Sequence, residues 1–438
     1  MSYFNKCFLL FMFLFLYAVL GEHPVLAKET PDDVRTAAPY DYTAIDGHAL
    51  NASPSVERSL DSLAAYLTAP AKNDREKVRA IFRWITSRVS YDAKSFLSGS
   101  RTDTTPEGVL RSRSAVCSGY AGLFQALAQR GGLECATIRG YAKGYGYAAG
   151  HTVGKVNHDW NAVNIDGSWY LLDSTWGAGS LSGKTFVQKF KEFFFLTPPE
   201  IMILSHFPVD TRWQLLQKPL SKAIFDCLAK PATDFFRLGL DWESLSHKDS
   251  LLRVKDRVDI TLATGIPLEY MARLKKNGKD VPFSTFVETT GGKATIHAEF
   301  PDSGMYELLL FAKPAGMSGS DPELLSYSIQ ADGTAPEEPK GFPVAYGAFY
   351  SNGGELYSPK QGNLKNGEVY PFRVKIPGAK KVAVIVGKLF VFLKNTGNDV
   401  FEGTAKVSNE SVMVSYNTGS SNNYIGILKY NVFQSGLQ

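Results

Sequence analysis

The 438-residue sequence has few cysteines, almost no excess of charge and only one long apolar run. Lys and Arg total 47 against 43 Asp and Glu, and the two signs are interspersed along the chain. The lack of a basic block argues against a nucleic-acid or membrane-surface protein. A hydrophobic content of 44% excludes a disordered or fibrous chain and is sufficient for several hydrophobic cores.

The single long apolar run lies at the N-terminus and bears on the compartment. Lys6 precedes an unbroken apolar stretch from Cys7 to Leu20, and a Val-Leu-Ala triplet then ends at Ala27. This pattern predicts a secretory signal peptide over residues 1–27 and a secreted protein, either extracellular or periplasmic. A membrane anchor is the alternative, but the run is shorter than the roughly 20 apolar residues that span a bilayer. We therefore expect no stable membrane insertion.

Three cysteines remain after the predicted cleavage, namely Cys117, Cys135 and Cys227. Exported proteins usually pair their cysteines, so an odd number leaves at least one free thiol. The structural interpretation is that all three are small buried apolar side chains. The functional interpretation is that Cys117 is reactive, while Cys135 and Cys227 are either buried or joined in a disulfide.

The residues after the predicted signal peptide divide by composition. Residues 28–52 are polar and rich in Pro, Asp and Thr, so we expect an extended leader. Residues 53–215 combine helical apolar spacing with later strand patterns, which predicts an α+β domain. Residues 216–332 and 342–438 consist of short alternating runs separated by turn signals, a pattern typical of β-sandwiches.

The α+β segment is expected to place Cys117 at the start of a helix. Apolar residues recur at helical spacing from Ser118 to Arg130, and two glycines follow. Two earlier helices are expected around residues 56–67 and 78–85, where apolar residues again recur three and four positions apart.

The strand patterns of this segment predict a β-hairpin that carries a histidine and an aspartate. The strands are expected at Cys135 to Tyr141, His158 to Ile165 and Ser168 to Asp173. An Asp-Gly pair between the last two strands is the preferred two-residue hairpin turn. If the residues that flank this turn pair with each other, His158 becomes a diagonal neighbour of Asp173 on one face. Diagonal backbone positions are roughly 7–8 Å apart, which an imidazole and a carboxylate can bridge with a hydrogen bond.

Cys117, His158 and Asp173 together have the composition of a nucleophile, a base and an orienting carboxylate. The carboxylate would fix the histidine tautomer and stabilise the imidazolium, which leaves the other ring nitrogen for the cysteine. A helix N-terminus and a neighbouring imidazolium both favour the thiolate, which is the competent nucleophile. Each residue alone has a structural interpretation, as a buried thiol, a satisfied strand histidine or a turn aspartate. Their combination favours a catalytic triad.

The same residues carry a resemblance to a known family. The motifs are Cys117 to Ala121 at a helix start, Gly140 to Gly144, His158 to Asn161 and Trp169 to Gly177. They resemble the transglutaminase-like superfamily, and most of all its kyphoscoliosis peptidase branch, over about residues 53–213. The resemblance implies a papain-like core with a Cys-His-Asp triad at Cys117, His158 and Asp173.

The C-terminal half is similar to the immunoglobulin-like modules of that branch. The segments that carry this likeness are residues 301–313, 356–359, 364–367, 376–379 and 401–403. Two features depart from the family pattern. Asp159 stands where many members have a small residue, and no side chain that completes an oxyanion hole is identified.

Two other groups of residues have the residue types of a binding site but not the spacing. Gly144, Gly146 and Gly150 lie among tyrosines, but their spacing does not fit a dinucleotide-binding loop, so we expect a mobile loop that leads into His158. His151, His158 and His206 with Cys117 contain no close pair of zinc ligands. We therefore expect neither a metal nor a cofactor.

These observations predict an α+β, papain-like transglutaminase-like core followed by all-β immunoglobulin-like sandwich domains, acting as a secreted thiol enzyme. Its thiolate would attack a peptide or carboxamide carbonyl of a protein or peptide substrate and form a thioester. Resolution by water makes a protease or amidase, which the family branch favours, and resolution by an amine makes a transglutaminase. A third possibility is an inactive scaffold in which the sandwiches bind a surface or protein partner.

Overall fold

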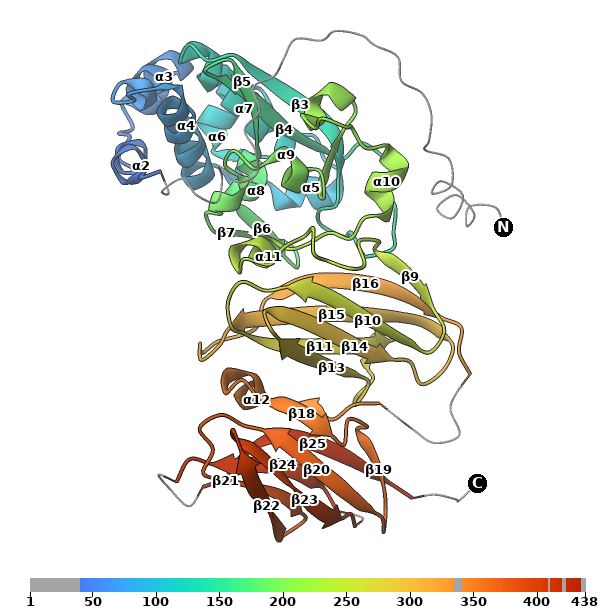
Figure 1. Ribbon diagram of the computed structural model, residues 1–438. Helices are drawn as coiled ribbons and strands as arrows, with labels where there is room; N and C mark the ends of the chain where they lie inside the picture. The colour runs from blue at the N-terminus through green and yellow to red at the C-terminus, as the bar shows by residue number, and fades with distance from the viewer. Residues whose placement is uncertain (1–39, 335–340, 409, 420–422, 435–438) are drawn as a thin grey trace. The chain divides into compact units, whose positions relative to one another are not determined.

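The computed structural model describes residues 40–334, 341–408, 410–419 and 423–434 (Figure 1). The chain divides into two units. The first comprises the described residues up to Tyr147 together with Thr152–Asp226, and the second comprises Ala148–His151 and the described residues from Cys227 onward. The predicted signal peptide lies outside the described residues.

Among the described residues, no helix combines the length and the apolar character that crossing a membrane requires.

The N-terminal part of the first unit, up to Arg130, is mostly helical. Its helices are α2 (Thr43–Leu50), η2 (Val56–Arg58), α3 (Leu60–Thr68), α4 (Asp74–Arg88), α5 (Ala93–Ser98), α6 (Pro106–Ser112) and α7 (Cys117–Arg130). The side chain of Asn73 accepts a hydrogen bond from the backbone N–H of Glu76 and so caps α4. Phe82 and Ile85 lie on its buried face, as the apolar spacing predicts. The predictions of helices over residues 78–85 and 118–130 are confirmed. The helix expected over residues 56–67 is divided into η2 and α3 by Ser59, which has an extended backbone.

The expectation of an extended leader over residues 28–52 is wrong for its last part. Residues 43–50 form α2, which buries Ile45 and Ala49 against the domain. Sequence composition missed this helix because it is short, and it depends on tertiary burial and on an ion pair between Asp46 and Arg79. Residues 28–39 lie outside the described part of the chain.

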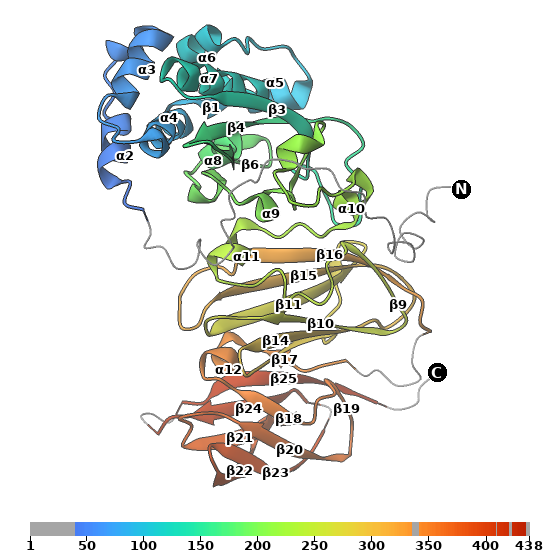
Figure 2. The same ribbon diagram turned by 45° about the horizontal axis from the view of Figure 1, so that its top comes forward.

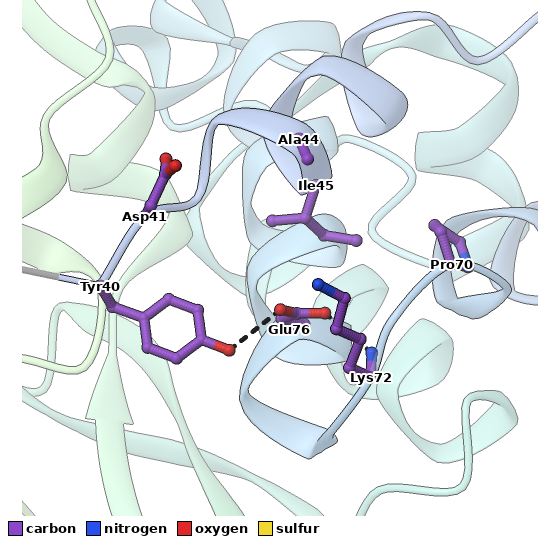
Figure 3. Close-up of a pocket in the computed structure, with 7 residues that line it drawn as sticks. All are labelled: Tyr40, Asp41, Ala44, Ile45, Pro70, Lys72 and Glu76. Atoms are coloured by element: carbon purple, nitrogen blue, oxygen red, sulfur yellow. Dashed lines mark hydrogen bonds between the residues drawn. The ribbon is translucent and has the colours of Figure 1, made fainter.

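The start of α2 also borders a surface cavity of about 410 Å³ (Figure 3). Its lining residues are Tyr40, Asp41, Ala44, Ile45, Pro70, Lys72 and Glu76. The buried carboxylate of Glu76 is satisfied there, because it accepts hydrogen bonds from the Tyr40 hydroxyl at 2.9 Å and from the Lys72 backbone N–H at 2.8 Å. The cavity contains none of the three predicted site residues.

Arg79 on α4 joins three segments of the first unit. Its guanidinium, only 3% exposed, pairs with Asp46 on α2 and with Glu192 on η3 (Glu192–Phe194). We expect Arg79→Met to lower the free energy of unfolding by about 3 kcal/mol, because breaking a buried ion pair strands its partners. The expected loss is no larger than this because Glu192 is 59% exposed and can be rehydrated when its partner is removed. Urea denaturation measures the change.

A matched control for Arg79→Met lies on the same helix. Lys77 pairs with Asp74 at 2.9 Å, but both side chains are about a third exposed. Lys77→Met should therefore cost less than about 1 kcal/mol. Equal losses in the two variants would refute a structural role for Arg79 at the centre of this helix packing.

A four-stranded antiparallel sheet forms the second layer of the first unit. Its strands are β3 (Cys135–Ala142), β4 (His158–Ile165), β5 (Ser168–Leu172) and β8 (His206–Pro208), in the spatial order β5-β4-β3-β8. Helix α7 packs against β3 and β4 (Figure 2). Ile165 pairs with Ser168 across the turn, which confirms the predicted hairpin register. Asp166 and Gly167 have φ of 52° and 84°, as a type I′ turn requires.

Short elements complete the first unit around this sheet. They are β1 (Ser90–Tyr91), β2 (Ser114–Ala115), α8 (Ser174–Ala178), β6 (Gly179–Ser182), β7 (Thr185–Gln188), α9 (Pro199–Met202), η4 (Thr211–Gln214) and α10 (Lys222–Cys227). β1 pairs with β2 in parallel, directly before the start of α7. The unit therefore has helices and an antiparallel sheet in separate layers, which is the predicted α+β arrangement.

The second unit is rich in β-strands. After the short α11 (Thr233–Arg237) come β9 (Leu251–Val254), β10 (Arg257–Ala263), β11 (Leu268–Lys276), β12 (Lys279–Asp280), β13 (Thr285–Thr290), β14 (Lys293–Glu299), β15 (Gly304–Pro314) and β16 (Glu323–Ala331). Strands β10-β14-β13 form one sheet and β12-β11-β15-β16-β9 form another. The alternation of buried and exposed residues along β10 is the pattern from which the sequence predicted a sandwich.

The described residues from 341 onward form a further set of strands. They are β17 (Val344–Ala345), β18 (Glu355–Ser358), β19 (Asn363–Lys365), β20 (Val369–Lys375), β21 (Lys381–Val386), β22 (Leu389–Gly397), β23 (Val400–Lys406), β24 (Val412–Asn417) and β25 (Ile425–Phe433), with α12 (Gly347–Ser351) between β17 and β18. Apart from β19, these strands pair side by side in the spatial order β17-β25-β24-β21-β22-β23-β20-β18. The expected domain boundaries at residues 332 and 342 stay predictions.

Candidate active site

Cys117 is the first residue of α7 and is half-buried. The preceding residue, Val116, is extended, so the chain passes from β2 directly into the helix. Gly119 permits this close approach, because a Cβ there would lie 2.8 Å from the Ala115 Cβ and 2.9 Å from a methyl of Val109. The backbone thus places a thiol at a helix N-terminus, where the free N–H groups favour negative charge.

His158 is the first residue of β4, and its ring meets the predicted carboxylate. Nε2 of His158 lies 2.8 Å from Oδ2 of Asp173. The two residues are diagonal neighbours in the hairpin, so the predicted distance relationship is confirmed. Both side chains are buried. The ring stacks near Trp160 and lies against Trp176, with ring centroids 6.1 and 5.4 Å away.

Asp173 ends the hairpin and caps α8. Its Oδ1 accepts hydrogen bonds from the backbone N–H groups of Thr175 at 2.8 Å and Trp176 at 3.1 Å. Burial alone would raise the pKa of Asp173, but the charge of His158 and the hydrogen bonds from His158 and His206 outweigh it and hold the pKa below its usual range. The carboxylate is therefore ionised at neutral pH, and an ionised carboxylate can only accept hydrogen bonds.

The protonation of His158 follows from that of Asp173. Because Oδ2 of Asp173 only accepts, Nε2 of His158 carries the hydrogen, and Nδ1 is left for Cys117. Burial lowers the pKa of His158, but the charge of Asp173, its hydrogen bond and a hydrogen bond with Cys117 together raise it above the ordinary value. The ring is thus adjacent to the sulfur and suited to take its proton.

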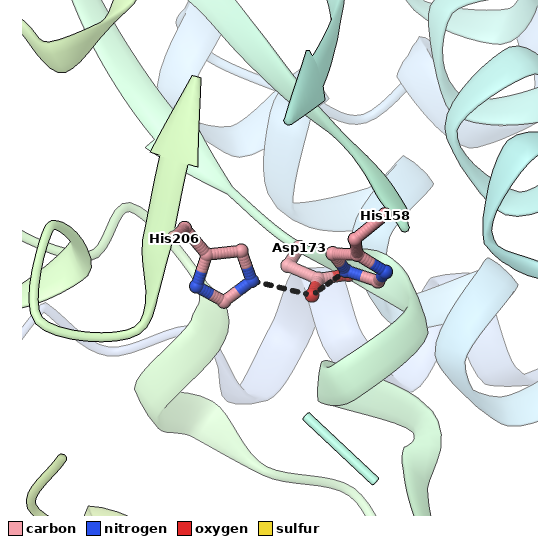
Figure 4. A group of neighbouring side chains, drawn as sticks. All are labelled: His158, Asp173 and His206. Atoms are coloured by element: carbon pink, nitrogen blue, oxygen red, sulfur yellow. Dashed lines mark hydrogen bonds and ion pairs between the residues drawn. The ribbon is translucent and has the colours of Figure 1, made fainter. Parts of the chain in front are cut away.

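His206 also belongs to the hydrogen-bonded group around Asp173, although the sequence did not predict it there. Its Nε2 lies 3.2 Å from the same Oδ2 of Asp173, and its Nδ1 lies 2.8 Å from the Ser205 hydroxyl (Figure 4). In the sequence, His206 enters only the group of possible zinc ligands. It comes from β8, which joins the sheet by pairing Ala142 with His206. No local pattern reveals a pairing between segments more than 60 residues apart.

The three residues in Figure 4 are also candidate metal ligands. Among the described residues, His158, Asp173 and His206 form the one group whose ligand atoms have suitable spacing, all within 4.8 Å of one another. Both Nε2 atoms, however, lie at hydrogen-bond distance from a single carboxylate oxygen. That geometry is typical of imidazole N–H donors around an anion. His151, a possible zinc ligand by residue type, is not part of this group.

The other residues that the sequence singled out lie apart from this network. Cys135 is a free, buried thiol, so it forms no disulfide with Cys227, and burial raises the pKa of its thiol to about 12. Asp159 pairs with Arg139 at 3.6 Å on the opposite face of β4 from His158. The glycine-rich loop contains no helix, as expected.

Tyr91, Phe96 and Tyr145 form a group of aromatic side chains that begins on β1, the strand paired with the residues before Cys117. Tyr91 on β1 pairs in register with Ala115, two residues before Cys117. Burial raises the pKa of Tyr91, and the charges of Cys117 and Asp173 add to the effect. Phe96 lies 5.6 Å from Tyr91 and 6.1 Å from Tyr145 between ring centroids. Phe96 and Tyr145 are 40% and 55% exposed, so this group of aromatic rings reaches solvent.

Comparison with known proteins gives two family matches. Residues 61–174 match the transglutaminase-like superfamily, and residues 223–340 match the KY-like, immunoglobulin-like domain. Kyphoscoliosis peptidase of Mus musculus is 33% identical over 309 residues, which cover 70% of this chain and 44% of the mouse protein. Kyphoscoliosis peptidase of Homo sapiens is 34% identical over 282 residues, 64% of this chain and 42% of that protein.

The chain thus spans less than half the length of these relatives. Among solved structures, a transglutaminase crystal structure is 17% identical, covers 36% of this chain and 37% of that chain, and has a TM-score of 0.21.

Proposed function

Because this chain carries a domain of the transglutaminase-like superfamily followed by a KY-like immunoglobulin-like domain, we propose that it is a thiol enzyme that hydrolyses peptide or amide bonds. The observation that carries the proposal is the hydrogen-bonded path from Asp173 through His158 to a cysteine at a helix N-terminus. Cys117 is the nucleophile in this proposal, His158 the general base and Asp173 the orienting carboxylate.

The acylation step balances within these residues and the substrate. Nδ1 of His158 takes the proton from the Cys117 thiol, and the sulfur adds to the carbonyl carbon of the substrate. When the tetrahedral intermediate collapses, the carbon–nitrogen bond breaks and the leaving amine takes the proton back from the imidazolium. The products of this step are a free amine and a thioester on Cys117.

Deacylation repeats the same proton transfer with water. His158 removes a proton from the water, whose oxygen attacks the thioester, and the sulfur leaves and regains the proton. Asp173 keeps Nε2 of His158 protonated throughout, so that only Nδ1 faces the reacting atoms. An amine in place of water would give transamidation with the same residues.

We favour hydrolysis over transamidation. The curated relatives at 33% and 34% identity are named peptidases. We further propose that the protein acts outside the cytoplasm, as its predicted signal peptide indicates, and that the β-rich domains hold a protein target or surface.

The reactivity of Cys117 tests the proposal directly. We expect iodoacetamide to label Cys117 near pH 6 far faster than an ordinary thiol, because the raised pKa of His158 keeps an imidazolium beside the sulfur. Ordinary thiols lose about tenfold in rate for each pH unit below their pKa of ~8.5. Peptide mapping by mass spectrometry gives the rate at each site.

Cys135 serves as an internal control for the labelling. Its buried thiol, with a pKa raised to about 12, should remain unmodified in the folded protein. Slow labelling of Cys117, with the pH dependence of an ordinary thiol, would contradict the proposal that this protein is a thiol enzyme. It would favour an inactive scaffold instead. Incubation with a glutamine-containing protein and a labelled primary amine separates the two reactions, because incorporation indicates transamidation and new N-termini indicate hydrolysis.

A further inference from the structure

Asp173 accepts hydrogen bonds from two imidazoles, where a Cys-His-Asp triad needs only one. Oδ2 lies 2.8 Å from Nε2 of His158 and 3.2 Å from Nε2 of His206, and all three side chains are buried (Figure 4). The two ring centroids are 5.3 Å apart. The second imidazole therefore contacts the carboxylate at the same atom that orients the proposed base.

The hydrogen-bond partners assign the protons of His206. Oδ2 of Asp173 only accepts, so Nε2 of His206 donates to it. Ser205, whose hydroxyl lies 2.8 Å from Nδ1, can donate to the remaining lone pair of the ring. Nε2 of His206 therefore carries a hydrogen, and the Ser205 hydroxyl is the partner of Nδ1.

The surroundings of His206 restrict its ring to this position. Its centroid lies 4.3 Å from that of Trp176 and 5.1 Å from that of Trp160. Its backbone belongs to β8, which pairs with the strand next to His158. The ring is therefore held by contacts with two tryptophan rings and by hydrogen bonds at both nitrogens.

We propose that His206 is a positioning residue, which holds Oδ2 of Asp173 toward His158 and keeps the carboxylate's hydrogen bonds satisfied. This inference rests on the proposed function of Cys117, His158 and Asp173. Oδ1 is fixed by two backbone N–H groups, and His206 fixes Oδ2, so the carboxylate has one orientation before substrate binds. His206 acts through Asp173 and does not touch the reacting atoms.

Two substitutions of His206 distinguish the effect of its hydrogen-bond donor from the effect of its side-chain volume. His206→Leu keeps an apolar side chain of similar size but removes the donor, and His206→Gln places an amide N–H near the position of Nε2. We expect kcat to fall by roughly 10- to 100-fold in His206→Leu with little change in KM, as for other buried groups that orient a reactive imidazole. His206→Gln should recover most of the loss.

Rates must be expressed per reactive thiol, because His206→Leu can also destabilise the fold. Stoichiometric labelling of Cys117 counts the competent molecules in each preparation. His48 provides a matched control, since its Nε2 lies 2.8 Å from the Tyr66 carbonyl oxygen and it contacts none of the proposed catalytic residues. His48→Leu should leave kcat per labelled site unchanged.

A spectroscopic signature distinguishes positioning from packing. In protein with 15N-labelled histidine, Nε2 of His158 should show a protonated nitrogen with a downfield hydrogen in the wild type and in His206→Gln. In His206→Leu this hydrogen should exchange faster, because the carboxylate that accepts it is no longer held.

The outcomes separate this inference from the proposed function. If wild-type turnover survives complete alkylation of Cys117, the proposed function fails. If turnover depends on Cys117 but His206→Leu matches the wild type per labelled site, or His206→Gln is as slow as His206→Leu, the positioning role is refuted. Loss of wild-type activity on dialysis against a chelator, restored by Zn²⁺, would also refute it and assign the three residues to a metal.

Discussion

Replacement of Cys117 by alanine is expected to reduce hydrolysis by roughly 10⁴-fold or more, the loss typical of removing a covalent nucleophile. Without the sulfur no thioester forms, and His158 has no thiol from which to take a proton. The fold should be little affected, because Cys117 is half-buried at a helix start and alanine is a good helix former. Turnover of a fluorogenic peptide and the urea unfolding midpoint measure the two effects.

The control for this variant is Cys135→Ala, which removes a thiol of the same kind from the buried face of β3. It should retain turnover, at a cost in stability from the small cavity. If Cys117→Ala kept its activity while Cys135→Ala lost it, the nucleophile would be misassigned. If neither variant lost activity, the measured hydrolysis would not be thiol chemistry.

Asp173→Asn is expected to lower kcat by roughly 10³- to 10⁴-fold with only a modest change in stability, by the argument that applies to other buried triad carboxylates. The backbone N–H groups of Thr175 and Trp176 require an acceptor, so the amide oxygen should take the place of Oδ1. The amide nitrogen then faces His158 in the place of Oδ2. His158 must accept at Nε2 and carry its hydrogen on Nδ1, where it cannot take the thiol proton.

The pH dependence of turnover provides a second measure of the same interaction. Asp173 raises the pKa of His158, so the imidazolium that protonates the leaving amine persists above neutral pH and is lost as the pH rises through that raised pKa. In Asp173→Asn this charge is gone, and the upper limb of the pH profile should move to lower pH. A downward shift in the variant is the expected sign, and an upward shift would contradict the assignment.

Asp159→Asn is the matched control for Asp173→Asn. The residue is next to His158 in sequence, but it pairs with Arg139 on the other face of β4. The substitution should change kcat far less than Asp173→Asn does. Comparable losses in both variants would indicate that general electrostatics near His158, and not the tautomer that Asp173 imposes, controls the rate.

The hairpin that carries two of the three proposed catalytic residues was predictable because its determinants are local. An Asp-Gly turn sets the register, and a period of two assigns His158 and Asp173 to one face. The helix start at Cys117 was equally local, since the apolar stripe of α7 and the glycines after Arg130 define its ends. These patterns involve residues within about four positions of one another or across one turn.

The helix α2 and the pairing of Arg79 were not predictable, although both are built from ordinary residues. A helix of eight residues is marginal alone and forms here because Ile45 and Ala49 are buried. Asp46 and Arg79 are 33 residues apart, and Glu192 is 113 residues from Arg79, so no local pattern relates them. Local composition therefore predicts an extended leader at residues 43–50, where the structure has a packed helix.

The sequence by itself determined the α+β class, the register of the hairpin and the helix start, because periodicity and turn chemistry act over a few residues. Only the tertiary structure brought α7 to the hairpin, so that Cys117 meets His158, and added His206 to Asp173 through the pairing of β3 with β8. Those contacts depend on how distant segments pack and which strands pair. Long-range packing is a property of the whole hydrophobic core, which no short stretch of sequence specifies.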